Sequence, residues 1–131
     1  MQTLIKISDA AVIAIHCIDH MIKNSKEVYI AAEIAKELNV SYNHLSKILQ
    51  LMAKHGFLKT IRGPHGGYSL TKKGEESTLK DIIELIDGKI QGNTCFMKTV
   101  VCKKDSCVLK DFLLRTMKDF EKTINTKIKK F

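Results

Sequence analysis

Apolar residues recur at helical spacing in five stretches of the chain. The stretches are residues 8–22, 31–38, 42–55, 78–87 and 108–131. In the first, alanine, valine and isoleucine cover nearly every side, which is typical of a helix that is buried on most of its surface. Each of the others carries an apolar stripe, so we expect it to lay one face against a shared core. The pattern predicts a mainly helical protein.

The second and third predicted helices are joined by only three residues, 39–41. Ser41 can cap the helix at 42–55 with its hydroxyl group. Gly56 follows that helix, where a left-handed residue often ends one. Two helices connected so closely predict a helix-turn-helix.

A short β-hairpin is predicted immediately afterwards. Residues 57–61 and 68–70 have strand composition, and residues 62–67 between them are dense in turn residues. A hairpin that directly follows a helix-turn-helix is a wing. We therefore expect a mainly α fold with a small β-hairpin, organised as a winged helix-turn-helix domain with a long C-terminal dimerisation helix.

The periodic pattern lapses after residue 88 and resumes only at the last stretch, whose apolar stripe runs to Phe131. So long a helix has only a small domain to lean on, and we expect a second chain to cover its apolar face. A helix folded back on its own domain is the alternative. The predicted parts are a winged helix-turn-helix domain (1–88), a cysteine loop (89–107) and a dimerisation helix (108–131).

The charge of the chain is concentrated in one stretch. The formal net charge is +8, and no carboxylate lies between Glu37 and Glu75. Basic residues fill that interval: Lys47, Lys54, Lys59, Arg62, Lys72 and Lys73. A solvated lysine-rich face usually mixes both signs. The loss of every acid instead favours a phosphate-facing surface, and thus a nucleic acid over a membrane.

The N-terminal apolar run, residues 10–18, is shorter than the roughly 20 residues of a membrane span. It predicts a core helix. We see no signal-peptide pattern and expect a cytoplasmic protein without a membrane partner. In a reducing compartment, four cysteines indicate metal or redox chemistry rather than disulfides.

Three of the cysteines lie in the aperiodic loop. Cys95, Cys102 and Cys107 are separated by six and four residues. Thiolates gathered in this way are the usual ligands of an iron–sulfur cluster or zinc. Three unrelated thiols remain the alternative. Cys17 sits among apolar residues of the first helix and is expected to be core.

The second helix of a helix-turn-helix offers the N-terminal part of its exposed face to the major groove of DNA. The candidate contacts here are Ser41, Tyr42, Asn43, His44, Ser46 and Lys47. Asn43 can pair with adenine and Lys47 can donate to guanine, while the serines suit phosphates or bases. Asn43 as a local turn former and Lys47 as a solvated charge are the alternatives.

The chain resembles the Rrf2 family of bacterial winged-helix regulators over nearly its whole length, and in particular the NsrR and IscR branches. The resemblance rests on Glu33-Ile34-Ala35, on parts of residues 40–49, and above all on the wing motif at residues 62–70, Arg-Gly-Pro-His-Gly-Gly-Tyr-Ser-Leu. It implies that Arg62, His65 and Gly66 contact DNA. Arg62 is one of only two arginines and can enter a narrow minor groove. The glycine could instead serve only the tight turn.

The resemblance also implies an iron–sulfur cluster, either 2Fe-2S or 4Fe-4S, on Cys95, Cys102 and Cys107. The central cysteine is displaced by one residue from the usual family spacing. No histidine follows His65, so the fourth ligand is expected to be an oxygen. Asp9, from the partner subunit, matches the family position and is favoured over Asp105. The alternative for Asp9 is a cap on the first helix.

We expect a homodimeric regulator, most simply a repressor, that binds a palindromic operator and senses nitric oxide or redox and iron status. An iron–sulfur homeostasis regulator and a cluster-free thiol switch are the alternatives within this class. From another class, a zinc-stabilised interaction module also fits. An enzyme is not expected, because no acid–base constellation accompanies the cysteines.

Overall fold

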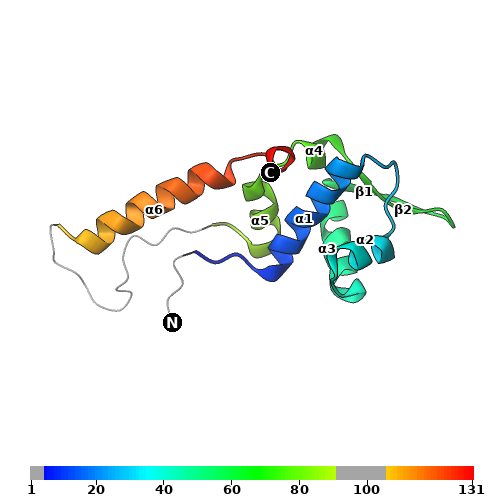
Figure 1. The fold of residues 1–131 in the computed structure, drawn as a ribbon, viewed down its shortest axis with the longest axis horizontal. Helices are drawn as coiled ribbons and strands as arrows, with labels where there is room; N and C mark the ends of the chain where they lie inside the picture. The colour runs from blue at the N-terminus through cyan, green and yellow to red at the C-terminus, as the bar shows by residue number, and fades with distance from the viewer. Residues whose placement is uncertain (1–4, 91–105) are drawn as a thin grey trace.

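A computed structural model describes residues 5–90 and 106–131 (Figure 1). The described part is mainly helical, with one two-stranded antiparallel sheet. The elements are α1 (Asp9–Asn24), α2 (Ala31–Leu38), α3 (Tyr42–Lys54), β1 (Leu58–Ile61), β2 (Gly67–Leu70), α4 (Lys72–Glu75), α5 (Leu79–Asp87), α6 (Val108–Ile124) and the 3-10 helix η1 (Ile128–Lys130).

Helix α1 forms the centre of the core, as its composition predicts. Its buried residues are Ala11, Ala14, Ile15, Cys17, Ile18 and Met21. It packs against α2, α3, α5 and η1. The N-cap is Ser8, whose hydroxyl accepts a hydrogen bond from the Ala11 N–H at 3.1 Å. Asp9 lies in the first turn and is not the cap, so that alternative for Asp9 was wrong.

The helix-turn-helix forms at the predicted residues. Asn39 ends α2 in the left-handed conformation, and the Ser41 hydroxyl accepts from the His44 N–H at 3.4 Å to begin α3. Four apolar side chains of α3 are buried: Leu45, Ile48, Leu49 and Met52. Gly56 follows with a φ of 85°, which a residue with a Cβ rarely adopts. The predicted end of α3 is confirmed.

The wing pairs Leu58 with Leu70 and Ile61 with Gly67. An additional contact fixes its base, since Tyr29 exchanges backbone hydrogen bonds of 2.7 and 2.8 Å with Tyr68. A Cβ on Gly67 would lie 2.3 Å from the Tyr29 carbonyl oxygen, so glycine is required there. Tyr29, two residues before α2, thus adds an isolated β-bridge beside the wing.

Two short elements after the wing complete the domain. Helix α4 was not predicted from the sequence, and it is capped by Thr71, which accepts from the Gly74 N–H at 3.1 Å. The N-cap of helix α5 is Thr78. Thr78 and Asp81 bond reciprocally in a capping box at 2.9 and 3.1 Å. Together α4 and α5 connect the wing to the rest of the core.

The last helix is shorter than its apolar stripe predicts. It ends at Ile124 rather than continuing to Phe131, because the chain turns and pairs Lys127 with Thr78 in an isolated β-bridge. Ile128 is fully buried in the core beside α1. The stripe marks burial at Leu113, Ile124 and Ile128, the last of these through a returning segment, but Leu109 and Phe131 are exposed. We call residues 125–131 the C-terminal segment.

In Figure 1, α6 extends away from the domain as an arm, and its C-terminal end lies beside α5. The β1–β2 hairpin projects from the opposite end of the molecule. Within residues 5–90 and 106–131, no helix is long and apolar enough to span a membrane.

Candidate nucleic-acid interface

The N-terminal part of α3 forms an exposed polar surface. Tyr42 is 55% exposed, and Asn43, His44 and Lys47 are exposed beside it. This face points away from the core because the buried residues of α3 occupy its other side. Its side chains can offer hydrogen-bond donors to phosphates and base edges.

Two of the predicted contact residues, Ser41 and Ser46, do not present a free hydroxyl group to solvent. Ser41 is exposed, but its hydroxyl caps α3. Ser46 is half-buried, and its hydroxyl oxygen is inaccessible and has no hydrogen-bond partner among the described residues. Ser46 would therefore reach a phosphate only after its side chain turned outward. Sequence spacing places Ser46 beside Lys47 but does not reveal this burial.

The tip of the wing exposes Arg62 and His65. Gly63 has a φ of 109°, and its carbonyl accepts a hydrogen bond from the Gly66 N–H at 3.0 Å. A Cβ on Gly66 would lie 2.1 Å from the Ile61 carbonyl oxygen. Gly66 is thus required by the turn itself, which holds Arg62 and His65 at the tip.

The cations of the acid-free stretch are exposed, and most have no acidic partner within residues 5–90 and 106–131. Lys47, Lys54, Lys59 and Arg62 are among these. Lys73 differs, because its ammonium group donates to the His55 carbonyl at 2.8 Å. It also lies 4.5 Å from the centre of the Phe57 ring. Most of the basic charge therefore remains available to a polyanion.

The predicted cluster ligands are only partly described. Cys95, Cys102 and Asp105 lie outside the described residues. Cys107 immediately precedes α6 and is half-buried, and Asp9 is exposed in the first turn of α1. No group of three or more metal-binding side chains occurs within the described part of the chain.

Thiol accessibility separates Cys17 from Cys107. Cys17 is completely buried, and its burial raises the pKa of the thiol to about 12. It is a core residue, as predicted. Cys107 is reachable from solvent, which a ligand or a redox-active thiol requires.

The two described ligand candidates do not meet within one chain. In Figure 1 the start of α1 and the start of α6 are far apart. A site that uses both Asp9 and Cys107 would therefore need a second chain. The donor types themselves, thiolates with one carboxylate, suit an iron–sulfur cluster with one oxygen-ligated iron.

Asp87 links the region of Asp9 to the end of α5. The Ser8 N–H donates to an Asp87 carboxylate oxygen at 2.9 Å, and the Ser8 hydroxyl donates to the other oxygen. An acid at the C-terminus of its own helix is electrostatically unfavourable. Here the Asp87 carboxylate lies at the N-terminus of α1, where a negative charge is favoured, so the pair holds the first turn of α1, which carries Asp9, against the end of α5.

A helix-turn-helix with an exposed polar second helix and a hairpin wing defines the winged helix-turn-helix class. The chain belongs to the Rrf2 family, whose profile is described as "Iron-dependent Transcriptional regulator" and matches residues 7–129. This confirms the family and the winged-helix fold expected from the sequence. Rrf2 proteins are DNA-binding transcription regulators, which agrees with the expectation that the chain is not an enzyme.

Two curated relatives illustrate the similarity. A putative HTH-type transcriptional regulator of Aquifex aeolicus is 28% identical over 74% of this chain and 67% of its own length. The regulator NsrR of Bacillus licheniformis is 32% identical over 66% of this chain and 58% of its own length. Other relatives are named IscR. The matches thus span about half to two thirds of most of these relatives.

Among solved structures, CymR of B. subtilis, titled the global cysteine regulator, is similar in fold. Its TM-score is 0.76 at 21% identity, and the alignment covers 95% of this chain and 93% of CymR. At this identity the likeness establishes the winged-helix fold only.

Proposed function

We propose that this protein regulates transcription as a homodimer that binds a palindromic operator. The observation that carries the proposal is the exposed, acid-free surface of α3 and the wing. In this arrangement α3 enters the major groove and the wing follows the adjacent minor groove. The proposed contacts are Ser41, Tyr42, Asn43, His44, Ser46, Lys47, Arg62, His65 and Gly66.

An exposed apolar surface on α6 supports a dimer. Val108 is 83% exposed, and three further apolar side chains nearby are exposed as well: Leu109, Phe112 and Leu114. Burying such side chains against a second copy removes apolar surface from water at about 25 cal/mol per Å². Of the predicted parts 1–88, 89–107 and 108–131, the last fits this role in the first turns of α6, whereas residues 125–131 pack on the domain.

We infer further that Cys95, Cys102 and Cys107 hold an iron–sulfur cluster, with Asp9 of the partner subunit as the fourth ligand. The iron-dependent description of the family and the NsrR relatives support the cluster. The separation of α1 and α6 supports a ligand from the partner. Asp9 as an oxygen ligand would leave the iron that it holds open to exchange with nitric oxide or oxygen. Through Asp9, loss of the cluster would change the dimer geometry and the spacing of the two α3 helices.

Other sensors remain as alternatives with distinct signatures. An iron–sulfur homeostasis regulator is supported by the IscR relatives. A cluster-free thiol switch is compatible with the CymR-like fold, and its mark would be a disulfide among the loop cysteines without iron. A zinc-stabilised module would bind DNA equally well with and without its metal.

Anaerobic purification followed by absorption spectroscopy and by iron and sulfide analysis tests the cluster. We expect visible charge-transfer bands with matching iron and sulfide, and their loss in Cys102→Ala. Cys17→Ala is the matched control, because it removes a thiol that is fully buried in the core. A colourless wild-type protein after attempted reconstitution would eliminate the cluster sensor and leave the DNA-binding proposal intact.

A further inference from the structure

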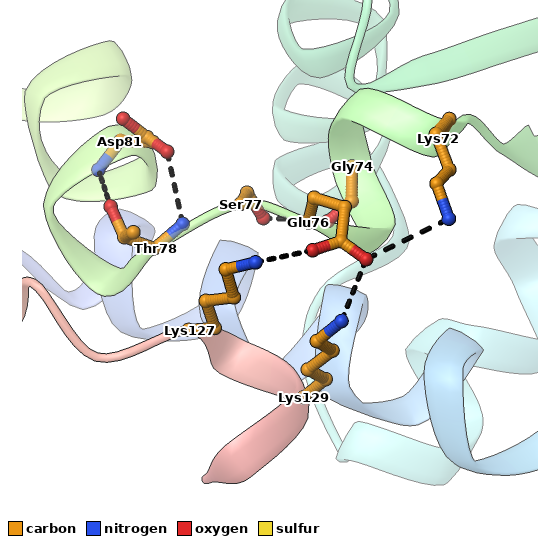
Figure 2. A network of polar contacts seen from close by, with 8 residues as sticks. All are labelled: Lys72, Gly74, Glu76, Ser77, Thr78, Asp81, Lys127 and Lys129. Atoms are coloured by element: carbon orange, nitrogen blue, oxygen red, sulfur yellow. Dashed lines mark hydrogen bonds and ion pairs between the residues drawn. The ribbon is translucent and has the colours of Figure 1, made fainter.

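Glu76 connects the C-terminal segment to α4, the short helix that follows the wing. Its two carboxylate oxygens accept hydrogen bonds from Lys127 at 2.5 Å and Lys129 at 2.6 Å. Lys72 of α4 lies 3.7 Å away on the same carboxylate (Figure 2). One partly exposed acid thus gathers lysines from two parts of the sequence that lie more than fifty residues apart.

Backbone contacts reinforce this junction. The Leu79 N–H donates to the Thr126 carbonyl and the Ile128 N–H donates to the Ser77 carbonyl, each at 3.0 Å. Ile128 is fully buried, and the Phe131 ring lies edge-on to His16 of α1 at 6.0 Å. The C-terminal segment is therefore held on the domain by backbone bonds next to Glu76 and by side chains that pack on α1.

The residues around Glu76 are in turn fixed to the base of the wing. The Thr71 hydroxyl donates to the Gly56 carbonyl at 2.6 Å, at the end of α3. Gly74 packs so closely that a Cβ would lie 2.2 Å from the Phe57 carbonyl oxygen, just before β1. The buried Ser77 hydroxyl donates to the Gly74 carbonyl at 2.6 Å. A displacement at Glu76 is thus passed directly to the ends of α3 and β1.

The arm formed by α6 leaves the domain and is attached near its C-terminal end (Figure 1). Ile124 belongs to the main core, and Phe120 packs against that core, whereas the first two turns of α6 expose apolar side chains. Within the described residues, motion of α6 therefore reaches the domain first through its last turn and the C-terminal segment.

We propose that the C-terminal segment is a clamp that sets the position of the wing relative to α6, with Glu76 as its positioning residue. The clamp rests on the proposed function in assuming that α3 and the wing bind DNA. It adds a path by which the geometry of the α6 dimer determines how the two wings meet the operator. Glu76 itself contacts no DNA in this scheme.

The test compares Glu76→Gln with Glu75→Gln in the full-length protein. Glu75 is exposed, adjacent and free of ion pairs within residues 5–90 and 106–131, so both variants change the net charge equally. The probe is a duplex selected from a random pool by the wild-type protein. Because removal of an acid generally strengthens binding to DNA, a purely electrostatic effect would tighten binding in both variants.

We expect Glu76→Gln to bind the selected duplex at least about fivefold more weakly than Glu75→Gln, within the usual range of coupling between sites. Equal or tighter binding by Glu76→Gln would overturn the clamp. Hydrogen exchange without DNA gives a second readout. We expect faster exchange in Glu76→Gln at Leu79 and Ile128 and also at the amides of β1 and β2.

If only the Leu79 and Ile128 amides exchange faster while the amides of β1 and β2 are unchanged, the segment stabilises its own contacts but does not position the wing, and the proposal fails. If the wild-type protein selects no duplex, the proposed function fails separately, and the exchange data alone decide whether the clamp controls the wing.

Discussion

Replacement of Arg62 by alanine tests whether the wing enters DNA. Arg62 is exposed at the tip and has no acidic partner among residues 5–90 and 106–131, so in the free protein the change should leave the fold intact. A dimer carries two copies, and each lost contact removes one cation from the DNA surface. With a slope of about −0.9 per neutralised phosphate, the plot of log affinity against log salt should flatten by about 1.8.

This change has a measurable size. Between 50 and 200 mM salt, a slope difference of about 1.8 alters the affinity ratio of wild type to Arg62→Ala by about twelvefold. Fluorescence anisotropy with the selected duplex, titrated at several salt concentrations, measures both slopes. Arg115→Ala is the matched control, because Arg115 is the only other arginine and is exposed on α6, away from the wing.

The wing assignment predicts a flatter slope for Arg62→Ala only. Equal slopes for the two variants would show that net charge alone controls binding, and would refute the placement of Arg62 in the DNA interface.

Further predictions concern the core, the clamp, the wing turn and the thiols. Ile128→Ala should lower the free energy of unfolding by about 2–5 kcal/mol in urea titrations, because it empties a fully buried site; a surface-like change below about 0.5 kcal/mol would contradict the burial. The bonds from the two lysines lower the pKa of Glu76 from 4.5 to about 2, so wild type should exceed Glu76→Gln in stability above about pH 4.5 and lose that advantage as the pH falls toward 2. Equal acid titrations of the two proteins would contradict this. Gly66→Ala should weaken DNA binding with unchanged helical circular dichroism, since its Cβ has no room in the turn; unaltered binding would mean that the turn can open freely. In protein freed of metal by chelation, alkylation at pH 8 with mass mapping should modify Cys107 and spare Cys17 until the protein unfolds, and equal rates would contradict the burial of Cys17.

The parts of the fold that follow from local patterns were predictable. Periodicity gives α2 and α3, and the cap residues Ser41 and Thr78 mark helix starts, since each satisfies free N–H groups within its own first turn. The end of α6 was not predictable in the same way. Its stripe continues at helical spacing, but pairing of Lys127 with Thr78, 49 positions away in sequence, determines the turn.

The candidate site likewise contains parts that local sequence patterns predict and parts that depend on tertiary contacts. The motif at residues 62–67 identifies the wing, because a tight turn limits which residues can occupy it. The isolated bridge between Tyr29 and Tyr68 and the contact between Ser8 and Asp87 depend on tertiary packing, and no local pattern identifies the two partners. An acid that ends its own helix, as Asp87 does, is the one sequence feature that could have indicated a distant donor.

The arrangement of the molecule also constrains how any signal at α6 can act. The wing and the N-terminal end of α6 lie at opposite ends of the molecule, so a change at Cys107, which precedes α6, must cross the domain to alter DNA binding (Figure 1). Two described contacts begin that path: Ser8 with Asp87 at the start of α1, and Glu76 with the C-terminal segment. Both lead onto α1, which supplies six buried residues to the core and therefore moves as a rigid unit. A signal that displaces either contact should reorient α1 together with α3, rather than deform the recognition helix itself.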